Sequence, residues 1–188
     1  MYVWARLLRT ALTTRSRGAY ELGDEGRLAF RCLPTDIDIN LHLNNARYMM
    51  LADVGRIDIF LRAGLIAKAR QNGWAPMLGG LQIVFVREVR LWRKFEVVST
   101  IETWEGTQVI GRHKFMLDSG ETAALILTTA GIYDRRNRRF VEIDKLFAKL
   151  GYHSATPRPP NEAERVFMAS HEHLRALAKN GNGREASS

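Results

Sequence analysis

The sequence predicts an α+β domain in which a long antiparallel sheet wraps around one buried helix. The first observation is a segment of helical spacing, 46–63, in which twelve of 18 residues are apolar, so that the helix is hydrophobic around most of its circumference. The second is a succession of four β-rich segments joined by turns too short for parallel crossovers. Because such a helix must be covered, we expect the sheet to enclose it.

The elements before the sheet can be assigned in order. Residues 27–33 alternate between apolar and polar side chains, as in a half-buried strand. A polar loop then leads to Asn44 and Asn45, both good N-cap residues, ahead of the helix at 46–63, and Gly64 is a stop signal. A strand, a loop and a central helix therefore open the domain.

The charged residues of this helix divide into two groups. At 100° per residue, Arg47, Asp58 and Arg62 cluster and predict a narrow solvated stripe. Asp53 and Arg56 fall on the opposite side among apolar neighbours, so we expect them to pair with each other or across an interface.

The sheet is expected as an antiparallel meander that follows a glycine-rich loop containing Gly73, Pro76, Gly79 and Gly80. Its segments are 81–91, 95–104, 107–117 and 122–133. A helical region at 141–150 follows, and a capping box at Asn161 and Glu164 opens a last helix that reaches about Ala178.

The length of 188 residues predicts one main domain with two appendages. We expect a basic N-terminal arm at 1–20, the domain itself at 21–156, and a C-terminal helix with a disordered tail at 157–188. The arm contains four arginines and no acid. It could dock on a membrane surface or act as a targeting peptide, although a short helix or loose arm packed on the domain is favoured.

Composition limits the environment and the partners. Apolar residues make up 46% and charged residues 26%, which excludes wholesale disorder. A formal charge of +8 suits anions such as phosphates, acidic cofactors or a lipid surface. The single cysteine, Cys32, forms no intramolecular disulfide and suits a reducing, cytoplasmic location. No uncharged stretch has the ~20 apolar residues of a spanning helix.

The richest polar cluster lies in the loop 36–45. A loop that ends at a buried helix brings unpaired backbone N–H groups and the positive end of the helix dipole close to its carboxylates, Asp36 and Asp38. A base or nucleophile beside preorganised donors is what acyl transfer requires. An equally supported alternative is that Asp36, Asp38 and the asparagines have no catalytic role and simply cap the helix and shape the turn. An EF-hand fails because Leu41 and Arg47 stand where glycine and glutamate are needed, and no metal site is predicted from the histidines.

The run DIDINLHLNNARYMMLADVGR at 36–56 resembles the D-x-D-x-x-G-H-x-N-N-x-x-Y signature of the 4-hydroxybenzoyl-CoA thioesterase-like hotdog family, and most of all its thioesterase superfamily member six branch. The resemblance extends more loosely over 27–150. It implies a hotdog fold, in which a long antiparallel sheet wraps a central α-helix, with extra C-terminal helices. It also implies an acyl-CoA thioesterase without a cofactor, CoA being part of the substrate.

Carried over residue by residue, the resemblance places the nucleophile or general base on Asp38. It places the backbone N–H that polarises the thioester carbonyl on Asn45. His42, Asn44 and Tyr48 match the rest of the signature and are expected to shape the site.

The sequence departs from the signature at Leu41, where the family has glycine. If that glycine serves a special backbone angle or a close approach, leucine could narrow the entry or mark a member with weak activity. This keeps open a non-catalytic hotdog protein that binds acyl-CoA or lipid at a membrane surface. A dehydratase of the same fold is less favoured, because the loop does not follow that pattern.

The resemblance implies a homodimer, which can pair further into a tetramer, and an acyl-CoA substrate with phosphate groups. Two basic turns are candidate phosphate contacts. They contain Arg87, Arg90, Arg93 and Lys94, and Arg135, Arg136, Arg138 and Arg139. A nucleic-acid partner is not expected, because no aromatic stacking platform accompanies these residues.

Overall fold

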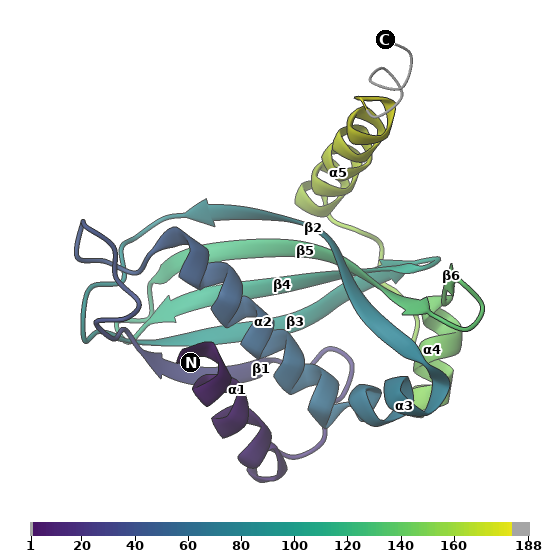
Figure 1. Cartoon of the computed structure of the whole chain (residues 1–188), viewed down its shortest axis with the longest axis horizontal. Coiled ribbons are helices and arrows are strands. Elements are labelled where there is room, and N and C mark those ends of the chain that lie inside the picture. The colour runs from purple at the N-terminus through teal and green to yellow at the C-terminus, as the bar shows by residue number, and fades with distance from the viewer. Residues whose placement is uncertain (1, 182–188) are drawn as a thin grey trace.

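A curled antiparallel sheet holds the long helix α2 (Asn45–Arg62) against one face in the computed structural model, which describes residues 2–181 (Figure 1). The strands are β1 (Gly26–Arg31), β2 (Trp74–Phe85), β3 (Lys94–Glu105), β4 (Gln108–Leu117), β5 (Thr122–Asp134) and the short β6 (Arg139–Phe140). Their order is β1-β3-β4-β5-β2, with β6 paired to β5. The predicted α+β class, with a sheet around a central helix, is confirmed.

The expected position of the first sheet segment is wrong. The glycine-rich stretch from Trp74 to Gly80 is part of β2, which ends at Phe85 and pairs with β5 rather than forming a hairpin with β3. The register shifts between Leu78 and Gly80, so these breaker residues mark an irregularity inside a strand instead of a loop. The β3–β4–β5 meander is confirmed, and β2 lies at the edge of the sheet.

Helix α2 begins as predicted but exposes a different face. The Asn44 side chain accepts the Ala46 N–H at 2.9 Å, and the helix ends before Gly64. Asp58, expected on a solvated stripe, is wholly buried, whereas the Asp53 side chain is 53% exposed and pairs with Arg56. Segments outside the helix cover Asp58, and helical spacing alone contains no information about them.

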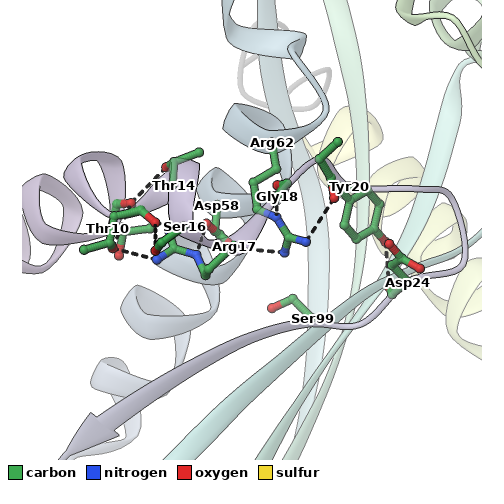
Figure 2. A network of polar contacts seen from close by, with 12 residues as sticks. Thr10, Thr14, Ser16, Arg17, Gly18, Tyr20, Asp24, Asp58, Arg62 and Ser99 are labelled. Atoms are coloured by element: carbon green, nitrogen blue, oxygen red, sulfur yellow. Dashed lines mark hydrogen bonds and ion pairs between the residues drawn. The ribbon is translucent and has the colours of Figure 1, made fainter.

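The covering segment is the N-terminal arm, which forms α1 (Tyr2–Leu12) and a 3₁₀ turn, η1 (Thr14–Arg17). Arg17 donates from Nη2 to Asp58 Oδ1 at 2.6 Å and to the Thr10 carbonyl at 2.7 Å. Arg62 lies 3.4 Å from the other Asp58 oxygen and donates to the Gly18 carbonyl at 3.0 Å (Figure 2). The expectation of a short helix packed on the domain is therefore confirmed.

Two apolar clusters fill the space around α2. One lies beneath its first half and includes Tyr48, Leu51, Phe95 and Phe115. The other brings together α3 (Leu65–Asn72), α4 (Ile143–Leu150) and the far ends of the strands, around Trp104 and Phe147. The core therefore continues along the length of the helix.

The C-terminal helix α5 (Glu162–Gly181) starts with the predicted capping box. The Asn161 side chain accepts the Glu164 N–H at 3.0 Å, and the Glu164 carboxylate accepts the Asn161 N–H at 2.8 Å. Helix α5 projects away from the sheet (Figure 1) and includes residues 179–181, which were expected in the disordered tail. The rest of that tail, 182–188, lies outside the described residues. Within residues 2–181, no helix is both long and apolar enough to cross a membrane.

Candidate active site

The polar loop between β1 and α2 folds back on itself at the amino-terminal end of the helix. The Asn44 N–H donates to the Asp36 carbonyl at 2.9 Å, and the Asp38 N–H donates to the His42 carbonyl at 3.1 Å. The Leu43 N–H donates to the Val89 carbonyl at 2.8 Å, which ties the loop to the segment between β2 and β3. These bonds keep the loop carboxylates beside the start of α2.

The two carboxylates of the D-x-D motif have different surroundings. Asp36 is completely buried, accepts the Leu33 N–H at 2.8 Å and pairs with Arg6 of α1 at 2.8 Å. Asp38 is partly exposed, accepts the Asn40 N–H at 2.9 Å and lies 3.7 Å from His42 Nδ1. Asp36 therefore stabilises the loop, whereas Asp38 is accessible to a substrate.

The start of α2 supplies the hydrogen-bond donors of the candidate site. Asn45 is the first residue of α2, and the first N–H groups of a helix have no acceptor within it. Asn44 uses its side chain to cap Ala46, which leaves the Asn45 N–H to a ligand or solvent. A backbone donor and the positive end of the helix dipole thus lie beside the loop that carries Asp38.

Leu41 adopts a backbone conformation that favours glycine. Its φ is 60°, in the left-handed region, and its N–H donates to the Asp38 carbonyl at 3.1 Å. This tight turn explains why glycine suits the position, since a β-carbon costs roughly 1–2 kcal/mol there. The Leu41 side chain is 65% exposed, so in this chain it faces solvent.

Tyr48 lies in the core beneath the loop. It is 2% exposed, and its ring packs against Phe115 at 4.8 Å and Phe85 at 5.1 Å between ring centroids. Burial raises the pKa of Tyr48 to about 12, so the phenol remains neutral. Its position suits a residue that supports the loop from below.

The two basic turns lie at different ends of the sheet. Arg90 forms an isolated β-bridge with His42, so its turn is next to the loop. Each arginine of this turn has an acidic partner: Arg87 pairs with Glu121, Arg90 with Glu88 and Arg93 with Asp118. Arg135 and Arg136 lie at the β5–β6 turn, at the opposite end of the sheet from the start of α2 (Figure 1).

Sequence reasoning missed two polar contacts, one at this loop and one elsewhere in the sheet. Arg6 reaches Asp36 across 30 positions, and nothing in the local pattern links the arm to the loop. His113 and Ser99 form a buried pair on neighbouring strands, at 2.8 Å between Nδ1 and Oγ. The alternation of β3 and β4 could have placed both side chains on the inner face of the sheet.

Metal ligands do not assemble around the loop. Across residues 2–181, no group of three or more His, Cys, Asp or Glu side chains is placed to hold a metal ion. Cys32, just after β1, is buried, and burial raises the pKa of its thiol. The chemistry available at the loop is that of carboxylate, imidazole and backbone N–H groups.

The amino-acid sequence is similar to those of THEM6 proteins from several animals. Protein THEM6 from Xenopus laevis is 30% identical over 95 residues, which are 50% of this chain and 46% of that protein. Protein THEM6 from Drosophila melanogaster is 22% identical over 133 residues, 70% of this chain and 66% of that protein. The chain thus spans about half the length of the Xenopus relative.

Solved structures share the fold at low sequence identity. A probable thioesterase, YbaW from Escherichia coli, has a TM-score of 0.63 at 17% identity and covers 67% of this chain and 96% of its own. The DHNA-CoA thioesterase from Staphylococcus aureus has a TM-score of 0.59 at 13% identity, with 84% and 95% covered. The fold is that of the hotdog thioesterases. The family model of the thioesterase-like superfamily matches residues 32–150, well over half of the sequence, and the chain belongs to that superfamily.

Proposed function

We propose that this protein is an acyl-CoA thioesterase that hydrolyses its substrate to a free acid and CoA. The observation that carries the proposal is the partly exposed Asp38 carboxylate in a loop bonded back onto the amino-terminal end of α2. Membership of the superfamily supports the reaction class. A carboxylate and unsatisfied N–H donors in one place are the minimum for acyl transfer.

Asp38 has two routes to the same products. As a general base it takes a proton from water, whose oxygen attacks the thioester carbon. The C–S bond then breaks, and the thiolate leaves and is protonated. As a nucleophile, its carboxylate oxygen attacks the thioester carbon, and the C–S bond breaks and releases the CoA thiolate, which is protonated. Water then hydrolyses the mixed anhydride to the free acid and restores the Asp38 carboxylate. In both routes the Asn45 N–H stabilises the oxyanion, and one such donor contributes roughly 10²–10³ in rate.

The basic turn next to the loop is the proposed phosphate contact of CoA. Arg90 is bridged to His42, and the arginines of this turn are largely exposed. Their acidic partners are exposed as well, so a phosphate can replace them at little cost. A hypothetical protein of Staphylococcus aureus that shares the fold, with a TM-score of 0.62 at 13% identity over 78% of this chain and 95% of its own, was solved in complex with CoA. Arg135 and Arg136 lie at the opposite end of the sheet from the loop, so they would contact only the phosphate of a CoA bound at the site of another subunit.

A homodimer is proposed through β2, the strand at the sheet edge. Along this strand Met77, Leu78, Val84 and Phe85 are exposed, and an unpaired apolar edge favours pairing with a second copy. Further pairing of dimers into a tetramer remains part of the proposal. The buried free thiol of Cys32 agrees with the proposed cytoplasmic location.

A second candidate is a hotdog protein that binds acyl-CoA or lipid at a membrane without turnover. Its support is the outer face of α1, where Trp4, Leu8 and Leu12 are exposed at i, i+4 and i+8 in an arm without acidic residues. Such a face suits the surface of an anionic membrane. The backbone strain at Leu41 is the second argument for weak turnover.

Thiol release separates the two candidates. Acetyl, medium-chain, long-chain and aromatic acyl-CoAs are assayed with the wild type and with Asp38→Asn. We expect hydrolysis that the variant loses while it keeps acyl-CoA affinity. Asp53→Asn, an exposed carboxylate on α2, is the matched control and keeps full activity. Tight acyl-CoA binding without release from any substrate would favour the binding protein.

A further inference from the structure

An apolar cavity lies beside the second half of α2, away from the candidate catalytic loop. Its volume is about 60 Å³, and it is partly open to solvent, with a lining supplied mainly by α2, strands β3–β5 and α4. The apolar side chains that line it include Ile59, Phe60, Ile101, Val109, Ile132 and Phe147. An engineered cavity of about 150 Å³ binds benzene, so this smaller space suits one end of a flexible alkyl chain, whose remainder extends through the open side of the cavity.

A residue that lines this cavity has a buried polar atom without a partner. His113 of β4 is 2% exposed, and its Nδ1 lies 2.8 Å from Ser99 Oγ. Its Nε2 has no hydrogen-bond partner among the residues that the structure describes. The other hydroxyl groups of the lining residues do have partners: Thr100 with Glu102, Thr128 with Gly111, Tyr20 with Asp24, and Tyr152 with Tyr20. A buried polar atom without a partner is costly, and His113 Nε2 is therefore where a ligand gains a hydrogen bond.

The electrostatics of the cavity favour a neutral ligand. Burial, together with the nearby Arg56 guanidinium, lowers the pKa of His113 to about 3, so the imidazole is neutral near pH 7. Arg56 also lines the cavity, but it is paired with Asp53. Either tautomer of a neutral imidazole is possible, and Nε2 either donates or accepts accordingly. A hydroxyl group can satisfy both tautomers, because it donates and accepts.

We propose that this cavity is a binding site for a small, largely apolar alcohol, held by one hydrogen bond between its hydroxyl group and His113 Nε2. The site is separate from the candidate catalytic loop. Arg56 lies eleven residues beyond Asn45, which at the rise of an α-helix is about 17 Å. The core cluster with Tyr48 and Phe115 fills the region beneath the first half of α2. The proposal therefore holds whether or not the protein is a thioesterase.

Titration with a matched pair of probes tests the hydrogen bond. 1-Pentanol and hexane have equal numbers of heavy atoms and differ by a hydroxyl in place of a methyl. Binding is followed through the ¹⁵N resonances of the His113 ring, which also report the tautomer. We expect pentanol to bind about tenfold more tightly than hexane, with a shift at Nε2. If pentanol does not bind, or if both probes bind equally, the proposal is overturned.

Variants locate the effect. The double variant His113→Leu with Ser99→Ala removes both polar partners and keeps the volume of the ring position, so the protein should remain folded. In this variant we expect pentanol and hexane to bind equally, as measured by calorimetric titration. Ile132→Val, on the apolar wall, is the control that keeps the preference for pentanol. A preference that survives in the double variant would place the hydroxyl group elsewhere and overturn the assignment.

Activity provides an independent check on the separation of the two sites. If acyl-CoA is hydrolysed, saturating pentanol should leave its KM unchanged. A competitive rise in KM that the double variant abolishes would show that the cavity is part of the acyl path, contrary to the proposal. The binding titrations remain decisive if no hydrolysis is observed.

Discussion

The two ends of α2 are held by the same device and serve different purposes. At the amino-terminal end, buried Asp36 pairs with Arg6, and at the carboxyl-terminal half, buried Asp58 pairs with Arg17. Both arginines come from the N-terminal arm. The first pair adjoins a polar loop with an accessible carboxylate, whereas the second lies in the half of α2 that also contributes Ile59 and Phe60 to the apolar cavity. The arm therefore fixes the helix at both ends, but only one of its contacts reaches the candidate chemistry.

The difference shows what a buried ion pair can do in this fold. Asp58 accepts from two arginines, which themselves donate to backbone carbonyls of the arm, so this cluster closes a chain segment over the helix (Figure 2). Asp36 accepts from Arg6 and from the Leu33 N–H, and its own carbonyl accepts the N–H of the helix cap. The Asp58 cluster contributes to stability alone, and the Asp36 cluster also sets the shape of the loop.

Removal of Asp58 should have the largest effect. In Asp58→Ala, Arg17 and Arg62 lose their buried anion, and we expect the free energy of unfolding to fall by about 3–5 kcal/mol. Urea denaturation measures the loss. Asp53→Ala, on the same helix, removes an exposed ion pair and should cost at most about 1 kcal/mol. Equal losses in the two variants would contradict the difference in burial.

Replacement of the arm arginines separates stability from activity. Arg6→Met and Arg17→Met each remove a charged hydrogen bond and should each cost about 1.5–3 kcal/mol in unfolding free energy. Only Arg6→Met should also lower kcat for acyl-CoA hydrolysis, by roughly tenfold with little change in KM, because it releases Asp36 and the loop. Arg17→Met serves as the control. An equal fall in kcat in Arg6→Met and Arg17→Met would contradict this difference. So would an Arg6→Lys variant whose kcat is as low as that of Arg6→Met.

The free energy of unfolding should depend on pH through His113, which lines the cavity beside the carboxyl-terminal half of α2. Burial lowers the pKa of His113 from its ordinary value of 6.5 to about 3, so below pH 6.5 the unfolded chain binds a proton that the folded chain does not. Stability is therefore complete above pH 6.5 and declines as pH falls toward 3, by roughly 2 kcal/mol at pH 5. Unfolding free energies at pH 7 and pH 5 measure this decline. It should disappear in the His113→Leu, Ser99→Ala double variant, and persistence there would assign it to other groups.

The smallest expected effect is at Leu41. Glycine relieves the cost of φ = 60° but gains entropy in the unfolded chain, so Leu41→Gly should stabilise the protein by about 0.5–1 kcal/mol. The urea midpoint measures this gain. Leu41→Ala keeps a β-carbon in the same conformation and should show no gain. A gain of equal size in both variants would assign the effect to loss of the exposed leucine side chain.

The local sequence pattern predicted much of this architecture because the residues that interact are close to one another in the sequence. The cap at Asn44, the capping box at Asn161 and Glu164, and the β3–β4–β5 meander depend on neighbours a few residues away or on adjacent hairpins. Pattern failed at β2, since Gly79 and Gly80 are turn formers locally but lie in a long strand once β5 is beside it. It failed again at Asp58, whose cover comes from the arm.

The sequence by itself determined the class of fold, the central apolar helix and the loop in which the carboxylates precede the helix cap. It did so because periodicity and caps are properties of contiguous residues. Only the tertiary structure decided that Asp36 is buried and Asp38 accessible, that Arg6 reaches the loop, and that His113 meets Ser99 beside a cavity. Burial and pairing of this kind join residues tens of positions apart, and the folded chain alone brings them together.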